Sequence, residues 1–115
     1  MNSEKKRLYE GMFIINSGLS EDARKKTLER VTKLIEERGG VLKKIHEMGK
    51  RRLAYEINKK REGFYYLLYF DFPSKYILEI TKELHLNEDL IRFIILKAEE
   101  VLEVLEFKSL AAQNY

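Results

Sequence analysis

Four segments predict β-strands, over residues 8–16, 41–57, 64–72 and 90–96. The first is rich in β-branched and aromatic residues and the third in aromatic residues, whereas the second is a long segment interrupted at Gly49. Two segments between them carry apolar residues at the spacing of an amphipathic helix. One covers residues 21–38, and the other begins at residues 73–74 and ends near residues 85–87. The sequence therefore predicts the element order βαββαβ.

Short polar and glycine motifs predict where these elements begin and end. Ser20 is a good N-cap for the first helix, and Gly39-Gly40 provides its C-terminal stop. Gly49 interrupts the second strand and predicts a bulge or bend. Residues 58–63 are polar and predict a hairpin loop before the third strand.

The order βαββαβ, with right-handed crossovers, predicts an α+β fold of the ferredoxin-like kind. In this sandwich a four-stranded antiparallel sheet carries two helices on one face. We expect a single domain over residues 1–97. The remaining residues, 98–115, form a tail with weak helical spacing that we expect to be flexible or helical.

The phase of the strands predicts which side chains face the helices. Glu10 and Asp71 are charged and should point away from the helices, and residues in step with them share that open face. The alternate positions then form the core under the helices: Tyr9, Phe13, Ile15, Phe64, Tyr66, Leu68 and Phe70. The open face carries Leu8, Met12, Ile14, Tyr65, Leu67 and Tyr69. Because this face is more apolar than a solvated sheet requires, we expect the tail or a protein partner to cover it.

Composition narrows the class of protein. The chain has 115 residues and no cysteine, which excludes a disulfide framework and a thiolate metal site. Its longest apolar stretch, residues 64–70, is too short to cross a bilayer, and its polar start does not resemble a signal peptide. We therefore expect a soluble cytoplasmic protein with no membrane association.

Patterns of catalytic or ligand-binding residues are absent from the sequence. His46 and His85 lie on different elements without a partner at metal-ligand spacing, and no phosphate-binding glycine loop or nucleophile motif occurs. We expect no catalytic residue, no metal, no cofactor and no small-molecule substrate. The protein is predicted not to be an enzyme.

Charge is concentrated in one part of the chain. The formal net charge is only +3, yet residues 41–61 hold eight basic and two acidic residues, a net charge of +6. Lysines on an edge strand can simply prevent edge-to-edge aggregation. Alternatively, the cluster binds the phosphates of a nucleic acid. With four to six phosphates neutralised, log affinity would fall with log salt at a slope of roughly −3 to −5.

Residues 62–69, Glu-Gly-Phe-Tyr-Tyr-Leu-Leu-Tyr, resemble the aromatic strand of the RNA recognition motif. An autonomous binder of single-stranded RNA is therefore an alternative function, with Phe64 and Tyr66 as base-stacking residues. The segment departs from the motif at Glu62 and Tyr65. In addition, the strand phase places Phe64 and Tyr66 on the helix side of the sheet.

Residues 46–57, His-Glu-Met-Gly-Lys-Arg-Arg-Leu-Ala-Tyr-Glu-Ile, closely resemble the Gly-x-Arg-Arg-Leu-Ala-Tyr-Pro-Ile block of bacterial small-subunit ribosomal protein six. Three further motifs match in order: Arg7-x-Tyr9-Glu10, Gly63-Phe64-Tyr65, and residues 84–92. The resemblance covers about residues 7–97. Glu56 departs from the pattern, because that family usually has proline at this position.

This resemblance implies a structural constituent of the small ribosomal subunit that binds the central domain of small-subunit ribosomal RNA. It also implies a heterodimer with small-subunit ribosomal protein eighteen, for which the open face is our predicted contact surface. Matching motif positions place Arg51, Arg52, Tyr55 and Arg92 in the predicted RNA site, and charge adds Lys50, Lys59, Lys60 and Arg61.

Overall fold

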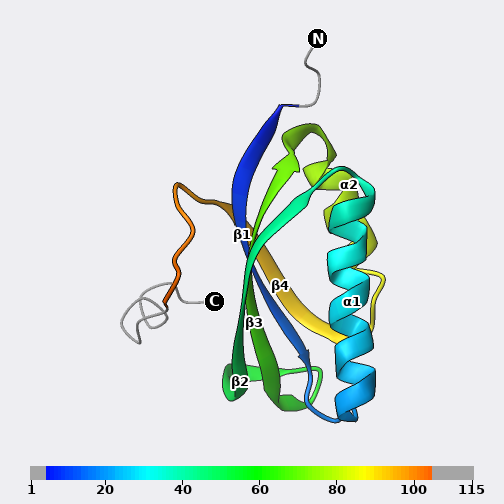
Figure 1. Cartoon of the computed structure of the whole chain (residues 1–115). Coiled ribbons are helices and arrows are strands. Elements are labelled where there is room, and N and C mark those ends of the chain that lie inside the picture. Colours follow the sequence, from blue (N-terminus) through cyan, green and yellow to red (C-terminus); the bar gives the residue numbers. More distant parts are fainter. Residues whose placement is uncertain (1–4, 105–115) are drawn as a thin grey trace.

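The computed structural model describes residues 5–104, and its elements follow the predicted order. They are β1 (Lys6–Asn16), α1 (Glu21–Glu37), β2 (Val41–Ile57), β3 (Lys60–Pro73), a 3₁₀ turn (Ser74–Tyr76), α2 (Ile77–Leu84) and β4 (Leu90–Lys97). The strands form one antiparallel sheet in the order β2-β3-β1-β4. Both helices lie on the same face of that sheet (Figure 1). The predicted ferredoxin-like sandwich is confirmed.

The ends of α1 follow from local side-chain chemistry. Ser20 caps the helix, because its Oγ accepts a hydrogen bond from the backbone N–H of Ala23 at 3.2 Å. The helix ends at Glu37, one residue before the predicted end, and Gly39 then adopts a φ of +88°. Glycine reaches this left-handed region without steric cost, which explains why the helix stops there.

The hairpin between β2 and β3 is tighter than the sequence predicted. Pairing continues to Ile57 opposite Lys60, so only Asn58 and Lys59 form the turn, with φ of 47° and 65°. Two successive positive φ values are typical of a type I′ hairpin turn. The predicted loop over residues 58–63 is wrong. Residues 60–62 of β3 extend beyond the last β1 pair, Asn16 opposite Gly63, so polar side chains are tolerated there.

The predicted irregularity at Gly49 is confirmed. The register of β2 against β3 shifts between Glu47 and Gly49, and Gly49 has a φ of +83°. A second irregularity lies between Arg52 and Ile57, where four residues of β2 face a single residue of β3. Such extra residues bend a strand and increase its twist, so the end of β2 can leave the plane of the sheet.

The core beneath the helices has the predicted composition. Side chains from β1 and β3 pack there against residues of both helices. The fully or almost fully buried members are Tyr9, Phe13, Ile15, Val31, Ile35, Tyr66, Leu68, Phe70, Phe72, Ile80, Leu84 and Leu90, with Phe64 partly buried at its margin. The strand phase inferred from Glu10 and Asp71 is therefore confirmed for this face.

The open face is covered to a large extent by the chain itself. Met12, Ile14, Leu67 and Tyr69 are each at most 2% exposed, although they belong to a cluster separate from the core beneath α1 and α2. Residues 98–104, here called the C-terminal strap, run on the side of the sheet opposite the helices (Figure 1). The strap contributes Ala98, Val101 and Leu102 to this second core, and the bent end of β2 contributes Leu53 and Ile57. Leu8 and Tyr65 remain half-buried.

Polar contacts tie the strap to strands on both sides of β3. The backbone N–H of Ala98 donates to the carbonyl of Leu8 on β1 at 3.0 Å. His46 Nε2 on β2 lies 2.6 Å from the carbonyl oxygen of Leu102, so this nitrogen donates a hydrogen bond. The strap forms neither helix nor strand, and the remainder of the predicted tail, residues 105–115, lies outside the described residues.

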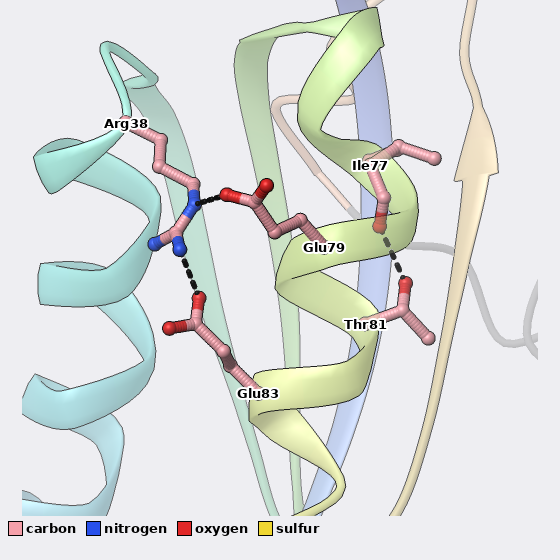
Figure 2. A network of polar contacts seen from close by, with 5 residues as sticks. All are labelled: Arg38, Ile77, Glu79, Thr81 and Glu83. Carbon is pink, nitrogen blue, oxygen red and sulfur yellow. Dashed lines mark hydrogen bonds and ion pairs between the residues drawn. The ribbon is translucent and has the colours of Figure 1, made fainter.

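An ion-pair network joins the end of α1 to α2 (Figure 2). Arg38 Nε lies 2.9 Å from Glu79 Oε2, and Arg38 Nη2 lies 2.6 Å from Glu83 Oε1. In the same helix, Thr81 Oγ1 donates to the carbonyl of Ile77 at 2.8 Å. Glu83 Oε1 is buried, so the positive charge of Arg38 offsets the cost of removing this carboxylate oxygen from water.

We expect Arg38→Met to lower the free energy of unfolding by about 1–2 kcal/mol, because it leaves a buried carboxylate oxygen without its cation. Urea denaturation monitored by circular dichroism measures the change. Lys25→Met is the matched control, since Lys25 pairs with Glu21 at 3.8 Å and both side chains are about two-thirds exposed. That control should lose less than about 0.5 kcal/mol. If both variants lose the same free energy of unfolding, the Arg38 ion pairs stabilise the fold no more than an exposed pair does.

The raised pKa of Tyr69 predicts that the free energy of unfolding falls at alkaline pH. Burial raises the pKa of Tyr69 to about 12 from its ordinary 10, and the negative charge of Glu10 adds to the shift. Between pH 10 and pH 12 the unfolded chain ionises at this position while the folded chain does not, so the stabilisation is complete below pH 10 and is lost as pH rises.

The free energy of unfolding of the wild type, relative to Tyr69→Phe, should therefore fall by about 1 kcal/mol between pH 9 and pH 11. Urea denaturation of both proteins at the two pH values measures this difference. The other tyrosines and the lysines are common to both proteins and cancel. A difference that does not change with pH would show that the Tyr69 hydroxyl titrates normally.

Candidate nucleic-acid interface

The basic segment forms one end of the molecule. Beyond Gly49, β2 and the first residues of β3 make a hairpin end that pairs Arg51 with Gly63 and Arg52 with Glu62. The cations that this hairpin end supplies are all exposed. They are Lys50, Arg51, Arg52, Lys59, Lys60 and Arg61.

The fold brings Tyr55 and Arg92 together from different strands. Arg92 Nη1 on β4 donates to the Tyr55 hydroxyl at 2.6 Å, and the guanidinium carbon lies 5.7 Å from the centre of the Tyr55 ring. β2 and β4 are the two outer strands of the sheet. The contact therefore exists because the end of β2 bends across the open face, which also buries Leu53.

Arg51 joins the same surface. Burial raises the pKa of the Tyr65 hydroxyl, while the positive charges of Arg92 and Arg51 lower it. The strand register agrees, because Arg51 pairs with Gly63, which lies on the same face as Tyr65 two residues further along β3. We call Arg51, Tyr55, Tyr65 and Arg92 the arginine cluster. It combines two cations and two phenol rings on the open face.

Lys50 lies on the other side of the sheet, so the predicted RNA set is divided between two faces. Its Nζ is 6.0 Å from the centre of the Phe64 ring, and the guanidinium of Arg24 on α1 stacks on that ring at 3.8 Å. Arg24 Nε also donates to the Tyr66 hydroxyl at 2.9 Å. The sequence did not predict that Arg24 contacts Phe64 and Tyr66, because no local pattern links residue 24 to a strand that begins 36 residues later.

The turn residues provide charge without a fixed geometry. Lys59 and Lys60 are exposed and form no ion pair within residues 5–104, whereas Arg61 Nε lies 3.3 Å from Glu56 Oε2. Glu56 occupies the position at which the resembling family usually has proline. Part of the Arg61 charge is thus already compensated, which makes Arg61 the weakest cation of the predicted set for phosphate contact.

The base-stacking alternative lacks the surface it needs. Phe64 and Tyr66 face the helices, Tyr66 is 5% exposed, and the Phe64 ring is occupied by Arg24. A base-stacking platform of the recognition-motif type requires aromatic rings presented on the sheet surface. The rings on the open face near the basic end are instead Tyr55 and Tyr65.

Other chemistry is sparse in the part of the chain that the structure describes. Within residues 5–104, no three histidine or carboxylate side chains gather where they could hold a metal ion. In that same range no helix is long and apolar enough to cross a membrane.

Comparisons with known proteins agree with one another. Residues 8–97 match the family model described as ribosomal protein S6. The chain is 54% identical over 114 residues to small ribosomal subunit protein bS6 of Protochlamydia amoebophila, covering 99% of this chain and 100% of that protein. It is 53% identical over 110 residues to bS6 of Chlamydia caviae, covering 96% and 98%. The crystal structure of 30S ribosomal protein S6 from Thermotoga maritima superposes with a TM-score of 0.76 at 38% identity, over 82% of this chain and 89% of that one.

Proposed function

The chain belongs to the ribosomal protein S6 family, and we propose that it binds the central domain of small-subunit ribosomal RNA through the arginine cluster and the β2–β3 turn. Membership of this family makes it a structural component of the small ribosomal subunit and not an enzyme. We place it accordingly on ribosomes of the bacterial cytoplasm.

The observation that carries the RNA proposal is that Arg51 and Arg92 share the open face with two tyrosines. Arg51 pairs with Gly63, which lies in step with Tyr65, and Arg92 bonds the Tyr55 hydroxyl. Guanidinium groups match phosphate oxygens in pairs and also stack on planar rings, so an arginine–tyrosine surface suits an RNA backbone with exposed bases. Lys59 and Lys60 extend the positive charge to the tip of the hairpin. The alternative hypothesis, that lysines on an edge strand prevent aggregation, explains the lysines along β2. It does not explain why Arg92 contacts Tyr55 on the open face.

We propose small-subunit ribosomal protein eighteen, the partner that the family resemblance implies, as the protein that contacts the open face, which the strand phase identifies as unusually apolar. Leu8 and Tyr65 are half-buried and directly accessible to a partner. The deeper residues of this face, Met12, Ile14, Leu67 and Tyr69, lie under the strap or the bent end of β2, so the partner would contact the outside of these two segments. A net charge of only +3 favours a partner that supplies further cations.

We expect the isolated protein to bind central-domain ribosomal RNA weakly and the complex with protein eighteen to bind it tightly. Filter binding at several salt concentrations should give a log–log slope of about −3 to −5 for the contacts of this chain. Arg51→Gln with Arg92→Gln should reduce the magnitude of that slope by about 2, because two phosphate contacts are lost.

Lys25→Gln with Lys26→Gln is the matched control, since it removes the same charge from exposed positions of α1. If both double variants lower the salt slope of RNA binding equally, the RNA responds to net charge and not to the arginine cluster. Tight binding at physiological salt without protein eighteen would contradict the role given to the partner.

The partner surface predicts that Leu8→Glu weakens binding to protein eighteen by at least about ten-fold, because it puts a charge into an apolar contact. Isothermal titration calorimetry with purified protein eighteen measures the affinity. Leu78→Glu is the control, as Leu78 is 76% exposed on α2, on the opposite side of the sheet. If Leu8→Glu folds normally and binds as tightly as this control, the partner lies elsewhere.

A further inference from the structure

We propose that a groove at the edge of β4 holds one unpaired RNA base, with His85 as its stacking surface. This inference rests on the proposed function and deepens it, because it names an unpaired nucleotide as the ligand. The groove lies between the β2–β3 turn and the loop that connects α2 to β4. It has a volume of about 740 Å³, within the range of sites that bind small ligands.

Three elements contribute to the walls of this groove. The turn contributes Asn58 and Lys60, the loop after α2 contributes His85 and Asn87, and β4 contributes Arg92 and Phe93. Among residues 5–104, β4 pairs only with β1, so its other edge has no partner strand in this range and borders the groove. An aromatic wall, two amides and two cations in one groove are the groups that single-stranded RNA recognition uses.

The aromatic wall is rigid on one side and accessible on the other. The His85 ring lies against the Phe93 ring with centroids 4.7 Å apart and an interplanar angle of 47°. Phe93 is in turn held by Phe13, a fully buried core residue, at 6.0 Å. His85 itself is exposed. A base can therefore stack on an imidazole whose position is supported by the core beneath the helices.

The polar groups around the ring suit a base rather than a phosphate. Asn87 Oδ1 accepts a hydrogen bond from the backbone N–H of Asp89 at 3.0 Å, which orients its NH₂ group as a donor. Glu88 also lines the groove, and its negative charge repels phosphate near the loop. The cations Lys60 and Arg92 line the groove from the turn and from β4. A nucleotide would accordingly place its base towards His85 and its phosphate towards Lys60 and Arg92.

The groove is continuous with the proposed phosphate contacts. Arg92 lines it and also bonds the Tyr55 hydroxyl at 2.6 Å. An RNA strand that follows the arginine cluster thus passes the mouth of the groove. Extruding a base costs little where the RNA is already single-stranded, so loops and bulges are the expected targets.

The test compares hexa-adenylate with a blunt 12-base-pair RNA duplex as probes of the full chain. The chain has two histidines, which makes imidazole NMR signals a direct readout. Hexa-adenylate should shift the His85 ring signals and leave those of His46 unchanged, because His46 bonds the strap. The duplex should shift neither, since its bases are not available for stacking.

Variants provide the second readout. His85→Ala should weaken hexa-adenylate binding at least about five-fold and leave duplex binding unchanged, and His85→Phe should retain the affinity. Leu86→Ala is the control, because Leu86 is adjacent and 81% exposed but does not line this groove. Fluorescence anisotropy measures the affinities, and circular dichroism confirms that each variant is folded.

The outcomes separate the two proposals. If hexa-adenylate shifts the backbone amides of residues 59–61 but not the His85 ring, the base site is wrong and the phosphate contacts stand. Equal shifts of His85 with hexa-adenylate and duplex also overturn the base site, because they indicate backbone binding. If neither the amides nor His85 respond and central-domain RNA also fails to bind, both proposals fail.

Discussion

The rest of the structure depends on the burial of β1 and β3 on both faces. These two strands occupy the centre of the sheet and carry large apolar side chains on both sides, with Phe13 and Phe70 on one face and Met12 and Leu67 on the other. Two helices cover one face, but the connections of a βαββαβ chain leave the other uncovered. Burial of such side chains stabilises a fold by about 1.5–3 kcal/mol each, so a second cover is strongly favoured.

The second cover explains the position of the candidate RNA site. The strap reaches one part of the open face, and the bent end of β2 reaches the other through Leu53 and Ile57. Leu53 and Tyr55 lie in the same four-residue irregularity of β2, between Arg52 and Ile57. Burial of the Leu53 side chain therefore brings Tyr55 to Arg92 on β4. The packing requirement thus brings charges from the two outer strands onto one surface, where RNA can contact them together.

The strap also connects packing with polar chemistry. Ala98 bonds β1 and Leu102 bonds His46 on β2, so the segment spans the sheet over Tyr69. Tyr69 is 1% exposed, and burial together with Glu10 raises its pKa to about 12. Without the strap, His46 and Tyr69 would lie on a sheet surface open to water. With it, His46 bonds the strap and Tyr69 is buried beneath it.

The sequence by itself determined the element order, the phase of β1 and β3 and the family, because these depend on side-chain periodicity and on contiguous motifs such as residues 50–55. It also located the concentration of charge in residues 41–61. Only the tertiary structure decided how that charge is arranged. Lys50 and Arg51 are neighbours in sequence but lie on opposite faces, Arg24 joins Phe64 across 40 positions, and His85 meets Phe93 at the β4 edge. These contacts have no local signal, since each follows from which side chains pack between distant elements. The two-residue turn has a partial one, because asparagine is favoured at the positive φ of Asn58, whereas lysine is unusual at the positive φ of Lys59.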